Sequence, residues 1–148
     1  GQGLTVSALQ LVRAYGVLEQ SGVMVTPHFL VDVPNDAEMA QSLMQDLTRR
    51  ETVADASVCD EVSEMLTSVV TEGTGQAAAV EGFAVTGKTG TAETGKEKSD
   101  AWFVGTAQAN GRSVTVAIVI EEGERGGGGA APKAATVFLA ALRELGAL

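Results

Sequence analysis

The chain has 148 residues, of which 45% are apolar and 20% charged, so it can bury the core of one globular domain. Its 10 basic against 19 acidic residues give a net charge of −9, which argues against nucleic acid or an anionic membrane as the main partner. One cysteine and one histidine exclude an intrachain disulfide, a thiolate zinc cage and a His-pair metal site, and we expect no metal and no cofactor. The longest apolar runs are strand-sized, so no membrane-spanning segment is expected.

The first part of the chain, residues 1–81, is predicted to be mainly helical. A helix over 5–20 has Ser7 and Gln10 in the positions of a capping box, and a short extended segment follows over 23–27. Two further helices are predicted over 36–50 and 57–71. Asn35 is the expected cap of the helix over 36–50. Their apolar stripes are interpreted as core-facing, and they consist of Met39, Leu43, Met44 and Leu47 in the first helix and of Val58, Val62, Met65, Leu66 and Val69 in the second.

Residues 82–148 change from helical to strand periodicity. Three strands are predicted over 83–91, 102–109 and 113–122, and the last two are joined by Asn110-Gly111, a strong hairpin signal. Strand 113–122 is apolar on both faces and is therefore expected to be central in its sheet. The tetraglycine 126–129 is expected to be a mobile loop, and a final helix is predicted over 132–145.

The predicted fold class is therefore α+β, with N-terminal helices, a three-stranded antiparallel meander and a C-terminal helix covering one face of the sheet. The strand 83–91 is expected at an edge of that sheet. The whole chain, 1–148, is interpreted as one unit.

Lys88 belongs to two overlapping motifs. From Gly82 the sequence matches the phosphate-loop pattern G-x-x-x-x-G-K-T, and from Lys88 it is K-T-G-T, which occurs in serine β-lactamases and penicillin-binding proteins. A phosphate loop follows a buried strand and opens into a helix, whereas here residues 83–86 are strand-like and no helical stripe follows Thr89. Nucleotide binding is kept as a remote alternative.

If the K-T-G segment forms a strand, its residues suit the binding of an extended peptide. Lys88 and Gly90 are expected to point to one face, and Thr89 and Thr91 to the other. Glycines inside a strand suggest that a neighbouring backbone approaches closely, and an edge strand can accept an extended peptide as an added strand. The threonine hydroxyls suit a peptide carboxylate, and a backbone N–H suits an oxyanion. The alternative is a glycine-kinked strand with an exposed lysine.

Five ordered segments resemble the C-terminal part of the transpeptidase domain of class B penicillin-binding proteins, within the serine β-lactamase and D,D-transpeptidase superfamily. They are Gly1-Gln2-Gly3 with Ala8-Leu9-Gln10, Val70 to Gly75, Gly87 to Glu93, Asp100 to Gly105, and Gly127 to Pro132. Val6-Ser7 departs from the Thr-Pro that is frequent in the family. The resemblance implies a partial transpeptidase-like fold and a parent protein that cross-links peptidoglycan stem peptides, binds β-lactams, and is anchored outside the plasma membrane.

The resemblance also implies roles for single residues. Lys88 would contact the serine of the family's S-x-N motif and the substrate carboxylate, which Thr89 and Thr91 would also bind. The Thr91 N–H would form half of an oxyanion hole, and Gly90 would keep the strand slim. These four residues are the candidate substrate-binding site.

The family's other two motifs do not occur in this sequence. None of the eight serines has a lysine three residues later, so S-x-x-K is absent, and neither asparagine follows a serine by two, so S-x-N is absent. No catalytic nucleophile is therefore assigned, and the isolated chain is expected to be inactive, unlike its parent. The alternative is a non-catalytic binding or scaffold domain of the same fold. Expected partners are the missing N-terminal part of the domain, whose strand would pair beside 113–122, or a second copy through the same residues.

Overall fold

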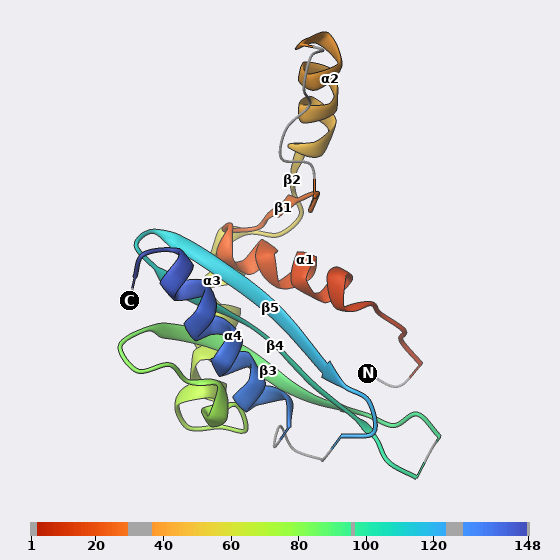
Figure 1. Ribbon diagram of the computed structural model, residues 1–148, viewed down its shortest axis with the longest axis vertical. Helices are drawn as coiled ribbons and strands as arrows, with labels where there is room; N and C mark the ends of the chain where they lie inside the picture. The colour runs from red at the N-terminus through yellow and green to blue at the C-terminus, as the bar shows by residue number, and fades with distance from the viewer. Residues whose placement is uncertain (1–2, 30–36, 96, 124–128, 148) are drawn as a thin grey trace.

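The computed structural model describes residues 3–29, 37–95, 97–123 and 129–147, and it confirms the α+β fold class. Figure 1 shows the elements in chain order. The helices are α1 (Ala8–Glu19), α2 (Ala37–Leu47), α3 (Ala56–Thr71), the 3-10 turn η1 (Gln76–Ala78) and α4 (Ala130–Glu144). The strands are β1 (Val23–Val25), β2 (Arg50–Thr52), β3 (Ala84–Ala92), β4 (Asp100–Ala109) and β5 (Arg112–Ile120).

The main sheet is the predicted antiparallel meander, in the order β3-β4-β5. Asn110 and Gly111 both have positive φ, 52° and 71°, as the tight turn between β4 and β5 requires. The K-T-G segment lies in β3, at an edge of this sheet, as predicted. Lys88 is at the middle of that strand, where a phosphate loop would open into a helix, so the phosphate-loop interpretation is wrong.

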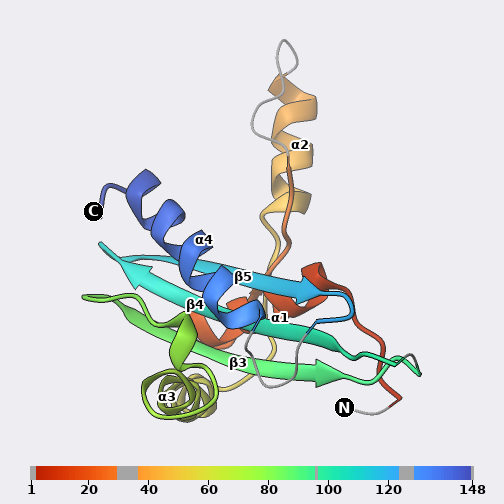
Figure 2. The ribbon, with the colours of Figure 1, turned by 60° about the horizontal axis from the view of Figure 1, so that its bottom comes forward.

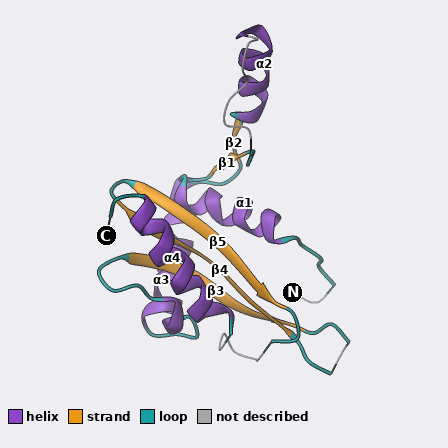
Figure 3. Ribbon diagram, viewed as in Figure 1, coloured by secondary structure: helices purple, strands orange, loops and turns teal. Residues whose placement is uncertain are grey.

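Helices cover both faces of the sheet. α4 packs on β4 and β5 from one face, α1 packs on the same two strands from the other face, and α3 lies against β3 (Figure 2). In Figure 3 the long strands lie between these helices, so the sheet forms the middle layer of the body. The final helix covers one face of the sheet, as predicted, and Phe138 and Leu142 are completely buried.

The core is centred on Phe103 of β4. Its ring meets Phe138 of α4 edge-on, with centroids 6.4 Å apart and an interplanar angle of 80°. The ring also lies over Gly87 and Gly105, which face each other across β3 and β4. A β-carbon at Gly87 would lie 2.4 Å from the Phe103 Cζ atom and 2.9 Å from the Val104 carbonyl oxygen. The close approach expected at Gly87 is thus made by the neighbouring strand.

The prediction that strand 113–122 is central is wrong for this sheet. β5 pairs with β4 alone among the described residues and forms the second edge. Its two apolar faces are covered by α4 and α1 instead, and Val114, Val116, Ile118 and Ile120 contact the core on the α4 side. Burial of both faces of a strand requires layers above and below it, and it does not require a strand on each side.

The predicted helix over 36–50 ends earlier, because Arg50 pairs with Val25 in the two-stranded sheet of β1 and β2. These two strands carry α2 away from the body (Figure 1). The core-facing interpretation of its stripe is also wrong, since Met39 is 56% exposed and Leu43 and Met44 are exposed as well. The predicted cap Asn35 lies outside the described residues.

In α3 the buried face is displaced from the predicted stripe. Cys59, Leu66 and Val70 are buried, whereas Val58 and Met65 are exposed.

The predicted capping box of Ser7 and Gln10 is confirmed at the start of α1. The tetraglycine interpreted as mobile lies largely outside the described residues. In the part of the chain that the structure describes, no helix has the length and apolar character to cross a membrane.

We predict that Gly87→Ala lowers the free energy of unfolding by about 1–3 kcal/mol, because the new methyl group overlaps the Phe103 ring. Gly16→Ala in α1 is the matched control, because a β-carbon there meets nothing within 4 Å and alanine favours a helix. Denaturant unfolding of both variants measures the difference. Equal stability of the two variants would contradict the close-packing role of Gly87.

Candidate functional site

The K-T-G strand shows the predicted alternation of faces. Thr89 is buried at 9% exposure, whereas Lys88 is exposed. The Lys88 ammonium lies along its own strand and donates a hydrogen bond of 2.9 Å to the Thr89 carbonyl oxygen. A lysine has three N–H donors. Among the described residues this bond occupies one of them, which leaves donors for a ligand.

Thr89 has a side-chain partner that the sequence did not reveal. Its hydroxyl lies 2.6 Å from that of Thr74, which is in the turn between α3 and η1. The two residues are 15 positions apart in the chain, so no helical or strand periodicity connects them. Thr91, two residues further along β3, is exposed.

α1 is tied to the same strand through Glu19, its last residue. The Glu19 carboxylate accepts hydrogen bonds from the Gln108 amide of β4 and, at 3.4 Å, from the Thr86 hydroxyl of β3. Thr86 lies on the same sheet face as Lys88, two residues before it. On this face the Thr106 and Thr115 hydroxyls, 2.9 Å apart, also join β4 to β5. These polar contacts hold α1, β3, β4 and β5 together on the face of the sheet that carries Lys88.

The sheet surface next to Lys88 is partly covered, since Gly90 and Trp102 are half-buried. Gly90, Trp102 and Val119 follow one another across the three strands, on the Lys88 face, and Val119 is 40% exposed. Two surface grooves, of about 410 and 430 Å³, lie beside α1 and the β4–β5 turn, and no K-T-G residue lines either. Among the described residues, Lys88 and Thr91 are thus exposed side chains on an edge strand.

The remaining titratable candidates lie apart from this strand. His28 is exposed in the segment after β1, and Cys59 is a buried free thiol in α3. Burial raises the pKa of the Tyr15 phenol of α1 above its ordinary value.

Comparisons with known proteins agree with the fold and the motif. Residues 1–142 match the penicillin binding protein transpeptidase domain family. The chain is 30% identical over 99% of its length to stage V sporulation protein D of Bacillus subtilis, and covers 24% of that protein. It is 36% identical over 82% of its length to the probable peptidoglycan D,D-transpeptidase PenA of Neisseria meningitidis serogroup A, and covers 20% of it.

Two solved structures show the same arrangement. A peptidoglycan glycosyltransferase from Burkholderia ambifaria matches 99% of this chain with a TM-score of 0.80 and 33% identity, and the chain covers 43% of that structure. The D,D-transpeptidase domain of a peptidoglycan glycosyltransferase from Eggerthella lenta matches 97% with a TM-score of 0.75 and 36% identity, with 33% of it covered.

Sequence, motif and fold together place this chain in the penicillin-binding protein transpeptidase family. The curated relatives that it matches are class B penicillin-binding proteins, as the resemblance of its sequence segments predicted. The chain spans about a quarter or less of the length of the relatives described above.

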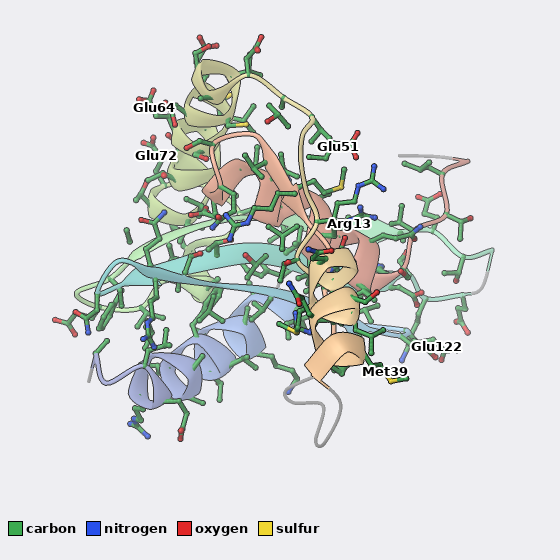
Figure 4. The ribbon with its side chains drawn as sticks, turned by 90° about the horizontal axis from the view of Figure 1, so that it is seen from above. Arg13, Met39, Glu51, Glu64, Glu72 and Glu122 are labelled. Carbon is green, nitrogen blue, oxygen red and sulfur yellow. The ribbon has the colours of Figure 1, made fainter. Side chains whose placement is uncertain are left out.

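We predict that Glu19→Ala lowers the free energy of unfolding by about 1 kcal/mol, because the Gln108 amide and the Thr86 hydroxyl lose a shared acceptor. Glu64→Ala is the control, since Glu64 lies on α3 and its side chain projects outward (Figure 4). Urea unfolding of both variants tests this. A loss at Glu64 as large as that at Glu19 would show that the bonds to β3 and β4 contribute nothing.

Proposed function

We propose that this chain is the substrate-binding part of a serine D,D-transpeptidase that cross-links peptidoglycan stem peptides and is acylated by β-lactams. The observation that carries the proposal is the K-T-G strand at an open sheet edge in a chain of the transpeptidase family. Relatives named as peptidoglycan D,D-transpeptidases support the reaction class. Such an enzyme would act outside the plasma membrane, with its anchor in the parent protein.

In this proposal Lys88, Thr89 and Thr91 bind the carboxylate of the stem peptide or of a β-lactam at the outer edge of β3, which side chains from both faces of the strand can reach. The Lys88 ammonium supplies the positive charge and the threonine hydroxyls supply directed donors. Gly90 leaves room for the ligand backbone, and the Thr91 N–H stabilises the oxyanion that forms when a serine attacks the carbonyl carbon. The Glu19 and Thr74 contacts support this role, because they hold β3 in place before a ligand arrives.

The nucleophile is proposed to come from residues outside this sequence. A serine needs a nearby base to attack at neutral pH, and no serine here has the family's S-x-x-K lysine. Among the described residues β3 has no strand on its outer side, which supports a second wall there that carries this serine and its lysine. A non-catalytic binding domain of the same fold is the competing proposal, and the presence of S-x-x-K in the longer protein distinguishes the two.

The acylation test compares this chain with a longer protein that also contains S-x-x-K. Both are incubated with a labelled β-lactam, and intact mass is measured. We expect an adduct on the longer protein and none on the 148-residue chain. Lys88→Ala in the longer protein should slow acylation by about tenfold or more, because a hydrogen bond to a charged group is lost.

A stoichiometric adduct on a serine of the 148-residue chain would overturn the assignment of the nucleophile. An unchanged acylation rate in Lys88→Ala would overturn the role of the K-T-G strand. Lys98→Ala is the matched control, because Lys98 is an exposed lysine outside β3.

We further propose that the free edge of β5 pairs with the missing part of the domain or, in its absence, with a second copy of this chain. An unpaired strand edge presents N–H and C=O groups that favour such pairing. Sedimentation of the 148-residue chain should show association that increases with concentration. Val119→Lys on β5 should weaken it, whereas Val137→Lys on α4, at a similarly exposed valine, should not. A strict monomer at high concentration would contradict the proposal.

A further inference from the structure

The Thr74–Thr89 contact links the K-T-G strand to the turn that follows α3. The two hydroxyl oxygens lie 2.6 Å apart, at the short end of the range for O–H···O bonds. Thr89 is buried at 9% exposure and Thr74 is exposed, so the contact joins a nearly buried hydroxyl to a residue at the surface. A side chain at this place controls how the Thr89 hydroxyl is oriented.

The turn that carries Thr74 is held tightly against α3. The Gly75 N–H donates to the Val69 carbonyl oxygen at 2.9 Å. A β-carbon at Gly73 would lie 2.9 Å from the Val69 backbone, and one at Gly75 would lie 3.1 Å from the Val69 oxygen. Neither position accommodates a side chain without a shift of α3. The two glycines therefore fix Thr74, which lies between them, at a defined distance from β3.

The direction of this hydrogen bond determines what Thr89 can bind. A threonine hydroxyl has one proton to donate and two lone pairs. If Thr74 donates to Thr89, the Thr89 proton remains available for a carboxylate oxygen, and each bond in the chain strengthens the other. If Thr89 donates instead, its proton is used internally. An anionic ligand therefore selects the first arrangement, in which Thr74 holds Thr89 as a donor.

We propose that Thr74 is a positioning residue, which orients and polarises the Thr89 hydroxyl for a carboxylate ligand without touching that ligand. The inference rests on the proposed function, because it assumes that Thr89 binds the carboxylate. It assigns a chemical role to the Gly73-Thr74-Gly75 turn, in addition to its role in chain reversal.

The test uses the longer protein that carries the S-x-x-K serine. Acylation rates are measured with a penicillin and with its methyl ester, which lacks the carboxylate charge. Thr74→Val should slow acylation by the acid by about tenfold, because one hydrogen bond is lost. It should change the rate with the ester little, so the acid-to-ester ratio falls. Thr74→Ser, which keeps the hydroxyl, should restore that ratio.

Thr67→Val is the matched control, because the Thr67 hydroxyl bonds only to a carbonyl oxygen of its own helix among the contacts described. A double substitution tests the route of the effect: in a Thr89→Val background, Thr74→Val should cause no further loss. Additive losses would show that Thr74 acts independently of Thr89 and would overturn the inference.

Equal slowing of the acid and the ester by Thr74→Val would also overturn it, because that pattern indicates a structural effect on the strand. Unchanged rates with both ligands would do the same. Failure of the proposed function looks different: the unsubstituted protein would form no adduct, or would show no preference for the acid over the ester. Either result removes the carboxylate site itself, and the role of Thr74 with it.

Discussion

The packing of the Phe103 ring across the opposed pair Gly87 and Gly105 is the constraint on which the body of this protein depends. It brings β3 and β4 together at a point where side chains on either glycine would collide with the ring. The same ring contacts Phe138 and so attaches α4 to the sheet. Because Gly87 immediately precedes Lys88, the packing that forms the core also fixes the position of the candidate site.

The two faces of β3 have different tasks. On the α4 side, Val85 and Thr89 are buried, and Thr89 is further held by Thr74. On the α1 side, Thr86 is held by Glu19, and Lys88 is left exposed two residues later. The strand is thus restrained from both faces before any ligand or further part of the domain arrives. Such preorganisation lowers the entropy lost when a ligand binds.

The parts of the fold that were predictable from the sequence have local causes. Asn110-Gly111 tolerates positive φ, Ser7 and Gln10 complete a cap within one helical turn, and the alternation in β3 follows from strand geometry. The K-T-G motif was found because its four residues are contiguous.

The parts that were not predictable depend on partners that are distant in the chain. Arg50 leaves its helix to pair with Val25, and the hydroxyl of Thr74 meets that of Thr89 fifteen residues later. The buried face of α3 was misassigned because its apolar residues surround more than one face, and packing selects the face that carries Cys59. No spacing within a single element contains this information.

The stalk formed by β1 and β2 has a consequence for how this chain tolerates change. β1 and β2 pair at three positions, from Val23–Thr52 to Val25–Arg50, and so close a long loop of the chain. Helix α2 lies within this loop and makes almost no contact with the rest of the protein. The entropy of closing such a loop grows only with the logarithm of its length. Insertions, deletions or replacement of the segment between β1 and β2 therefore cost the rest of the molecule little stability. A foreign peptide or a reporter can be inserted in this segment without disturbing β3.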